Sequence, residues 1–168
     1  MLPTTKIRTL TSEDYPIIKE IYELGIQSGN ATFETKAPTW NEWDQSHLAT
    51  CRFFAIDEKG NGAGWGALTP VSGRCVYSGV AEVSVYVHPG FQGKGIGKKL
   101  LFELIAESEK QNIWTLQAGI FPENIASLRI HEQCGFRQVG YHEKIGKMKN
   151  VWRDTALLER RSKVVGTN

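Results

Sequence analysis

The stretch that decides the fold runs from Ala81 to Gly97 and reads AEVSVYV, then HPGF, then QGKGIG. In its first part, Ala81–Val87, apolar and polar residues alternate, which is the period of a β-strand. One face carries Ala81, Val83, Val85 and Val87, and the other carries Glu82, Ser84 and Tyr86. The alternation predicts a strand with one packed face and one face available for chemistry.

The glycine-rich segment Gln92–Gly97 leads from this strand into an apolar stripe at helical spacing, made of Ile96, Leu100, Leu101, Leu104 and Ile105. A strand that turns into a helix aims backbone N–H groups and the positive helix end at one point, where an anion binds well. We expect Gly93, Gly95 and Gly97 to adopt positive φ and to let a phosphate approach the backbone. Lys98 and Lys99 oppose the helix dipole by roughly 0.3–1 kcal/mol each unless an anion is near.

Spacing excludes two better-known phosphate loops. A P-loop requires G-x-x-x-x-G-K-[ST], but Gln92 lies five residues before Gly97, and Lys98 is followed by Lys99. A dinucleotide fingerprint requires G-x-G-x-x-G, but after Gly93 and Gly95 the third glycine position holds Lys98. A strand-to-helix turn without any ligand stays open as the alternative.

The flanking sequence predicts the order β, α, α, β, β, β, α, β, α, β, β, and hence a mixed α/β sheet with helices on its faces. Strands are expected around residue 7 and at 52–57, 63–69, 81–87, 114–120, 138–145 and 151–159. Helices are expected from 11–14 to about 25–30, at 40–47, from 96 to about 110, and at 124–133, the last closed by Gly135. The two final strands are expected to be joined by the loop GKMKN.

Length and composition indicate one globular domain, residues 1–168, with 40% hydrophobic and 23% charged residues. The net charge of +2 does not favour nucleic acid or an anionic membrane as a partner. No apolar stretch approaches the roughly 20 residues needed to span a bilayer, and the start MLPTTKIRTL lacks a signal-peptide core. We therefore expect a cytoplasmic protein.

Cysteine and histidine spacing indicates neither disulfides nor metal. Cys51, Cys75 and Cys134 are far apart and contain no C-x-x-C pair, so small buried hydrophobic residues are the expected role. H-E-x-x-H and G-x-S-x-G do not occur, which argues against a zinc site and a nucleophilic triad. The histidines outside the motifs, which have no metal-ligand spacing, are His47, His88 and His142.

Two signatures in order resemble the GNAT superfamily of N-acetyltransferases. Gln92-x-x-Gly95-x-Gly97 after VSVYV is similar to the cofactor motif Q/R-x-x-G-x-G/A, and Asn124–Phe136 is similar to a second signature of Asn, a helix and a closing Gly-Phe. The resemblance covers nearly the whole chain. It implies the GNAT fold, a twisted and mostly antiparallel sheet of about six to seven strands with helices on both faces, and acetyl-CoA as co-substrate.

Within that superfamily the chain resembles the phosphinothricin and methionine sulfoximine N-acetyltransferases. The similarity lies in Ala31–Glu34, Ala81–Glu82, Ile130–Glu132 and Trp152-x-Asp154. It implies an enzyme that acetylates the α-amine of a small amino acid, a homodimer, and a role in antibiotic or herbicide resistance.

The resemblance also implies which residues contact the cofactor. Strand backbone would bind the pantetheine arm and polarise the thioester carbonyl, the glycine loop would bind the pyrophosphate, and Asn124 would contact pantetheine, with a plain helix N-cap as its alternative. The full set is Val85, Tyr86, Val87, Gln92, Gly93, Lys94, Gly95, Ile96, Gly97, Lys98, Asn124 and Ser127.

Two residues are predicted to be catalytic. Acetyl transfer to an amine needs a base for the ammonium and a proton for the leaving thiolate. Glu82, on the polar strand face, matches the family's base position, with a solvated strand glutamate as the alternative. His131 lies where many superfamily members have a Tyr that can protonate the departing thiolate. A core or solvent-facing histidine is the alternative, and Tyr141 is a less favoured acid.

Three substrate residues are predicted, all before the catalytic strand in the sequence. Arg74 is expected to bind the substrate carboxylate, unless it is a surface arginine, and Phe33 and Glu34 to form the substrate wall. Direct transfer in a ternary complex is expected. A peptide or protein N-terminal acetyltransferase and a non-catalytic acyl-CoA sensor remain alternatives.

Overall fold

The computed structural model describes residues 4–168 and contains one seven-stranded sheet with the order β1-β2-β3-β4-β5-β7-β6. The strands are β1 Lys6–Thr9, β2 Phe53–Ile56, β3 Gly62–Pro70, β4 Val80–Val87, β5 Thr115–Ile120, β6 Arg137–Met148 and β7 Val151–Arg161. The helices are α1 Tyr15–Ser28, α2 Trp40–Ser46, α3 Ile96–Lys110 and α4 Ile125–Gln133, with 3-10 turns η1 Ser12–Asp14, η2 Cys75–Tyr77 and η3 Pro89–Phe91. The predicted order of helices and strands is confirmed.

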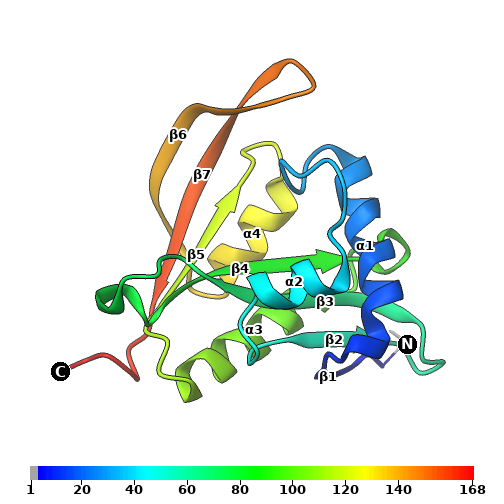
Figure 1. The fold of residues 1–168 in the computed structure, drawn as a ribbon, viewed down its shortest axis with the longest axis horizontal. Helices are drawn as coiled ribbons and strands as arrows, with labels where there is room; N and C mark the ends of the chain where they lie inside the picture. Colours follow the sequence, from blue (N-terminus) through cyan, green and yellow to red (C-terminus); the bar gives the residue numbers. More distant parts are fainter. Residues whose placement is uncertain (1–3) are drawn as a thin grey trace.

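The sheet is antiparallel except at one pair, β4 and β5, which run parallel. That pair is short, because only Val80–Glu82 of β4 face Thr115–Gln117 of β5. Beyond Glu82 the two strands diverge, as Figure 1 shows. From Val83 to Val87 β4 still pairs with β3 on one edge, and its other edge has no strand partner among residues 4–168.

Helices cover both faces of the sheet, as expected. On one face α1 and α2 pack Ile18, Ile21 and Trp43 against Trp65 of β3. On the other face α3 lies close to the sheet, because a Cβ at Gly64 or Gly66 would come within 3.2 and 3.0 Å of Leu100 and Leu104. Glycines in β3 therefore let α3 approach the strand backbone beside the glycine loop.

The start and end of α1 agree with the sequence signals. Thr11 and Asp14 form a capping box, and Asp14 also pairs with Arg8 at 2.6 Å. The first turn is a 3-10 turn, and α1 proper follows from Tyr15. The helix ends at Gly29, whose φ of 71° is the left-handed C-terminal geometry.

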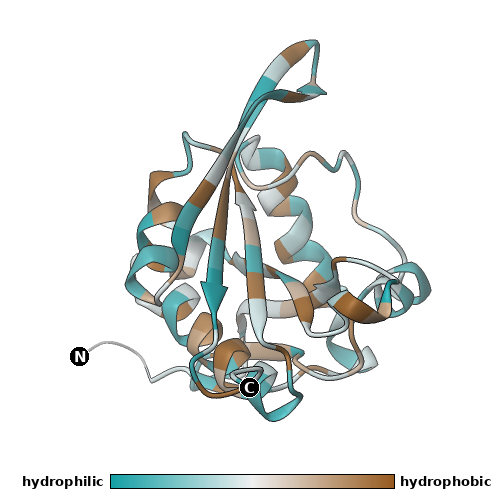
Figure 2. Cartoon of the chain, turned by 90° about the vertical axis from the view of Figure 1, so that its left-hand side faces the viewer, coloured by the Kyte–Doolittle hydropathy of each residue, from teal (hydrophilic) through white to brown (hydrophobic). Residues whose placement is uncertain are grey.

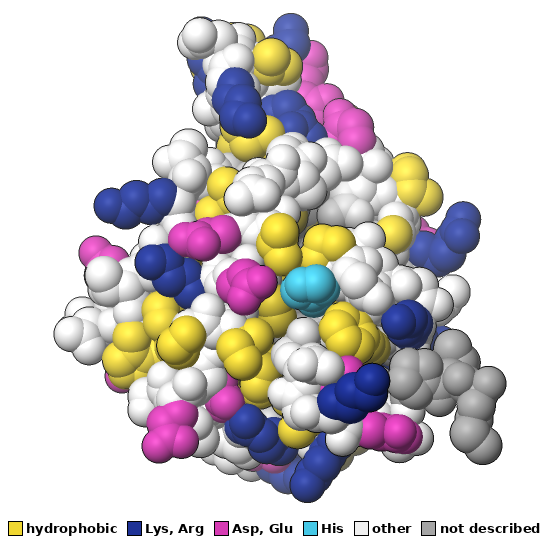
Figure 3. Space-filling view, turned by 90° about the vertical axis from the view of Figure 1, so that its right-hand side faces the viewer, with side chains coloured by type: hydrophobic (Ala, Val, Ile, Leu, Met, Phe, Trp, Pro, Cys, Tyr) yellow, Lys and Arg dark blue, Asp and Glu magenta, His cyan; other side chains and the backbone are white. Residues whose placement is uncertain are grey.

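The predicted GKMKN loop between the last two strands is wrong in its length. β6 continues to Met148 and β7 starts at Val151, so the turn contains only Lys149 and Asn150, with φ of 48° and 65°. Two residues with positive φ make the tight turn that suits twisted strands, but Lys149 is an unusual residue there and gave no signal. This hairpin projects from the body (Figures 1 and 2), and basic and acidic side chains gather on it (Figure 3).

The cysteine prediction is confirmed at two positions and wrong at the third. Cys51 and Cys134 are buried, whereas Cys75 lies exposed in η2, and all three are free thiols. Residues 4–168 contain no helix that is long and apolar enough to cross a membrane, and no group of three or more potential metal ligands.

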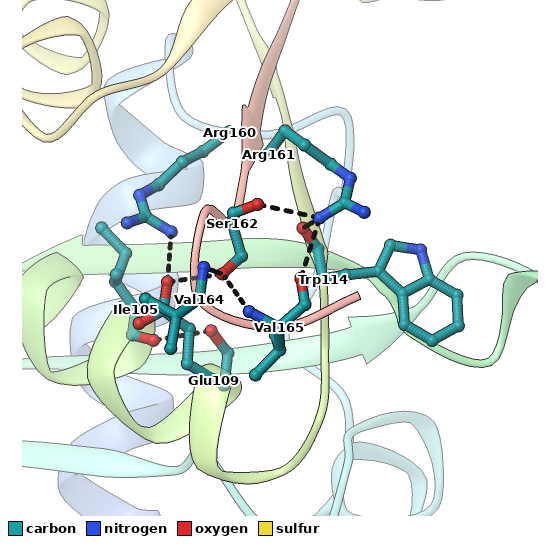
Figure 4. A network of polar contacts seen from close by, with 9 residues as sticks. Ile105, Glu109, Trp114, Arg160, Arg161, Ser162, Val164 and Val165 are labelled. Atoms are coloured by element: carbon teal, nitrogen blue, oxygen red, sulfur yellow. Dashed lines mark hydrogen bonds and ion pairs between the residues drawn. The ribbon is translucent and has the colours of Figure 1, made fainter. Parts of the chain in front are cut away.

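A polar network ties the C-terminal segment to the end of α3 (Figure 4). Glu109 accepts hydrogen bonds from Arg160 at 3.1 Å and from the Ser162 hydroxyl at 2.8 Å. The same hydroxyl oxygen accepts from the amides of Val164 and Val165 at 3.0 and 3.2 Å. Ser162 is buried, so its hydroxyl links the chain after β7 to the helix behind the sheet.

We predict that Ser162→Ala lowers the free energy of unfolding by about 1 to 3 kcal/mol, because it removes the donor to Glu109 and the acceptor of two amides. Urea denaturation would measure the change. Ser12→Ala, at an exposed hydroxyl, is the matched control and should change stability by less than about 0.5 kcal/mol. Equal stability of the two variants would contradict the network's role.

Candidate active site

A cavity of about 840 Å³ lies where β4 and β5 diverge. Its walls come from the loop 31–38, α2, β4, the end of β5 and α4. The side chains predicted from the polar face of β4, Glu82, Ser84 and Tyr86, all line it. The alternation in the sequence therefore identified one wall of the cavity correctly.

Glu82 presents its carboxylate to this cavity without a hydrogen-bond or ion-pair partner in residues 4–168. The side chain is exposed to solvent on the cavity side, and the surrounding cavity walls limit the hydration of its carboxylate. This desolvation raises the pKa of Glu82 above the ordinary glutamate value. A carboxylate with a raised pKa and a free lone pair is suited to take a proton.

His131, which lies on α4, also lines the cavity and is 4% exposed. Its Nδ1 lies 2.7 Å from the carbonyl oxygen of Ser127. A carbonyl only accepts, so Nδ1 carries the proton and Nε2 of the neutral ring has a free lone pair. Burial lowers the pKa of His131 and outweighs the opposing effect of the Ser127 hydrogen bond, which favours the neutral ring.

No sequence pattern indicated the aromatic wall of the cavity on the side of α1 and α2. Tyr22, Trp43 and Trp65 line the cavity there, with His47 stacked on Trp43 at 4.0 Å. Burial raises the pKa of the Tyr22 and Tyr86 phenols, so both stay protonated hydrogen-bond donors. Tyr86 was visible as a polar-face residue of the strand, but no local signal linked the tryptophans to it.

The glycine loop turns from η3 into α3 with its amides free. Gly93 and Gly95 have φ of 75° and 76°, as predicted. In the described part of the chain, residues 4–168, the amides of positions 93–98 have no acceptor, and the first helical bond joins the Lys99 amide to the Gly95 carbonyl at 3.1 Å. Six consecutive free N–H groups at a helix start, without an acidic residue in the first turn, form a strong anion site.

The expectation of positive φ is wrong for Gly97. This residue lies inside the first turn of α3 and has helical backbone angles. A Cβ there would come within 3.0 Å of Ile130 and 3.4 Å of Val87. The third glycine is therefore needed for close packing of α3 against α4 and β4.

The two predicted lysines of the loop contact neighbouring groups. Lys94 donates to the Gly90 carbonyl at 3.1 Å, and the Lys98 ammonium lies over the Phe102 ring, 5.9 Å from its centroid.

Asn124 forms the N-cap of α4, since its Oδ1 accepts from the Ser127 amide at 3.2 Å. Its Nδ2 donates to the Asn30 carbonyl at 3.1 Å, so the side chain also contacts the loop after α1. The helix-cap alternative is thus observed, and the second Nδ2 proton is still available. Ser127 lines the cavity one turn before His131.

The predicted substrate residues divide into two groups. Phe33 and Glu34 line the cavity, and Phe33 packs against Phe121 at 4.8 Å. Arg74 lies exposed in the loop between β3 and β4, over the Tyr77 ring at 5.5 Å, and does not line the cavity. Tyr141, the alternative acid, lies on the projecting hairpin and donates to Asp154 at 2.7 Å, outside the cavity.

Residues 7–136 match the model of the acetyltransferase (GNAT) family. The chain belongs to this family. It is therefore an acetyltransferase.

Similar proteins fit the same assignment. The GNAT chain is 31% identical over 163 residues to a phosphinothricin N-acetyltransferase from Alcaligenes faecalis, covering 92% of this chain and 81% of the relative. It is 40% identical over 78 residues to an L-methionine sulfoximine/L-methionine sulfone acetyltransferase from Salmonella typhimurium, covering 46% of each. A phosphinothricin acetyltransferase from Sinorhizobium meliloti, solved with AcCoA, superposes with a TM-score of 0.89 at 27% identity, covering 98% of this chain and 92% of that one.

We predict that at pH 7 the His131 ring is neutral with its proton on Nδ1, because burial lowers its pKa and the Ser127 carbonyl accepts from Nδ1. Nitrogen-15 NMR of the ring would show a protonated Nδ1 and a bare Nε2, with titration below the ordinary value of about 6.5. His131→Asn would assign the signal. A doubly protonated ring at pH 7 would contradict this account.

Proposed function

We propose that the protein transfers the acetyl group of acetyl-CoA to the α-amine of a small amino acid by direct attack in a ternary complex. The observation that carries this proposal is the unpartnered Glu82 carboxylate, which faces the cavity at the point where β4 and β5 part. An amine in the cavity would lie between this carboxylate and the free edge of β4.

The chain's own groups fit the proposed co-substrate. The free amides of the loop 93–98 suit its pyrophosphate, and the unpaired edge of β4 from Val85 to Val87 suits its amide-containing arm. Asn124 would donate its second Nδ2 proton to that arm. When bound, acetyl-CoA supplies an activated thioester carbonyl, and a β4 amide near Tyr86 or Val87 would donate to the developing oxyanion.

Two side chains would move protons. Glu82 accepts a proton from the substrate ammonium, directly or through one water, which leaves a neutral nucleophilic amine. We propose that His131 protonates the leaving thiolate. Because its neutral ring has a bare Nε2, the ring would first take up at Nε2 the second amine proton, which the nitrogen loses once the C–N bond has formed, and would then pass it to the thiolate as the C–S bond breaks.

The charged side chains that line the cavity favour an amino-acid substrate whose own side chain is uncharged. Glu34, Glu42 and Glu82 line it together with a single cation, Lys36. An α-amine suits the carboxylates. Lys36 in the cavity wall and Arg74 outside it, in the loop before β4, are proposed to attract the α-carboxylate. A second negative charge on the substrate side chain would meet the remaining carboxylates. We therefore propose a substrate with an uncharged polar side chain, of the methionine sulfone type, in preference to an anionic phosphinate.

We predict that Glu82→Gln lowers kcat by a factor of about 100 or more, because it removes the proton acceptor. Acetyl-CoA affinity, measured by calorimetry, should change less than about twofold, since the phosphate loop is untouched. Glu103→Gln, at an exposed position of α3, is the matched control and should keep wild-type kcat.

The acid side of the pH profile should follow the same residue. Because the pKa of Glu82 is raised, its base form is lost at a higher pH than for an ordinary glutamate as pH falls. Full activity of Glu82→Gln would remove this residue from the mechanism. Binding of acetyl-CoA without turnover on any amine would favour the sensor alternative.

We predict that kcat/KM for methionine sulfone exceeds that for phosphinothricin at least fivefold, because the phosphinate adds a negative charge. Release of the free CoA thiol would measure it. Lys36→Met and Arg74→Ala should each raise the KM for methionine sulfone and should not affect its carboxamide, which lacks the carboxylate. Preferred turnover of peptide N-termini would overturn the amino-acid proposal.

A further inference from the structure

Arg153 lies on β7 opposite Gly146 of β6, three residues after the turn residue Asn150 of the projecting hairpin, and its side chain is only 13% exposed. One terminal nitrogen donates to the Gly29 carbonyl at 2.9 Å. The other donates to the Asn30 Oδ1 at 2.9 Å and to the Glu123 carboxylate at 3.3 Å. The guanidinium plane also lies over the Phe121 ring, 4.0 Å from its centroid.

These contacts join two segments more than 90 residues apart in sequence. Gly29 and Asn30 begin the loop 29–39, which has no helix or strand and contributes residues 31–36 to the cavity wall. Phe121 and Glu123 belong to the turn between β5 and α4, which ends at Asn124. The Asn124 side chain joins the same two segments, because its Nδ2 donates to the Asn30 carbonyl at 3.1 Å.

Few other contacts hold this loop. At its far end the Tyr15 hydroxyl donates to the Pro38 carbonyl, and within it the Glu34 amide donates to the Thr32 hydroxyl at 3.1 Å. Phe33 packs between Phe121 and the backbone at Gly146, where a Cβ would lie 2.7 Å from its ring. Between its ends the loop also meets the Tyr22 and Tyr86 hydroxyls at Thr32 and buries Ala37, and its remaining support comes from the turn and strand that Arg153 contacts.

We propose that Arg153 is a positioning residue that holds the loop 29–36 against the turn 121–124. This rests on the proposed function, in which the loop forms the substrate wall and Asn124 contacts the co-substrate. The guanidinium fixes the distance between the two, so the amine and the thioester meet in one geometry. A loop without this anchor gains conformational freedom that substrate binding must then remove.

An arginine is required for this set of contacts. Its planar fork donates in two directions at once and stacks on a ring, whereas the lysine ammonium is a compact charge on a flexible stem. Lysine at this position keeps the positive charge near Glu123 and loses the simultaneous bonds to Gly29 and Asn30. Charge and positioning are thereby separable by experiment.

The kinetic test compares Arg153→Gln and Arg153→Lys with the wild-type protein. Both variants should raise the KM for methionine sulfone about tenfold, with kcat within about threefold and acetyl-CoA affinity within about twofold. Arg137→Gln is the matched control, because Arg137 is 71% exposed and meets Glu159 only at 3.9 Å. An unchanged KM in Arg153→Gln, full rescue by Arg153→Lys, or an equal effect of Arg137→Gln would overturn the proposal.

A second measurement does not depend on any activity. Hydrogen exchange of the amides in 30–36 should accelerate about tenfold in Arg153→Gln, and exchange in β3 should stay unchanged. Asn30→Ala should produce part of the same effect, and the double variant should exchange no faster than Arg153→Gln alone. Acceleration spread evenly over the chain would indicate general destabilisation and overturn the positioning role. If no amino acid is acetylated but the loop exchange follows this pattern, the proposed substrate is wrong and the positioning role holds.

Discussion

The divergence of β4 and β5 after Glu82 is the constraint on which the rest of the site depends. Parallel strands that separate leave two edges whose backbone groups have no partner in the sheet. Such groups are costly to bury without an acceptor or donor, so the opening must stay accessible or accept an extended ligand. The cavity lies at this opening, and a thioester arm with its own amides is the kind of ligand that such an edge pairs with.

The same divergence explains why the acidic residue and the glycine loop belong together. Glu82 is the last residue of β4 that pairs with β5, and the free edge begins immediately after it. Five residues further on, the strand ends and the chain turns through Gly93 and Gly95 into α3, whose first amides are also free. Along this one strand and turn, a carboxylate, an unpaired edge and an anion site follow in the order that an amine, a thioester and a pyrophosphate require.

Sequence patterns predicted local features well and contacts between distant segments poorly. The alternation in β4, the capping box at Thr11 and the glycine turn each depend on neighbouring residues, so their geometry could be read from spacing. The role of Gly97 could not, because its close neighbour Ile130 lies on another helix. It likewise depends on how separate elements pack that Trp43 and Trp65 line the cavity and that Arg74 does not.

The contacts of Arg153 could not be predicted from the sequence either, and the physical reason is clear. A lone arginine in a strand carries no motif, and its partners Asn30 and Phe121 are unremarkable loop residues. Only the fold brings them into contact, at the place where the loop 29–39 has no secondary structure of its own. Rigid strands can set the position of Glu82, but a loop that forms the opposite wall needs a separate anchor to hold it within reach. A buried guanidinium that bonds to carbonyl, amide and carboxylate oxygens supplies that anchor from the strand beside the site.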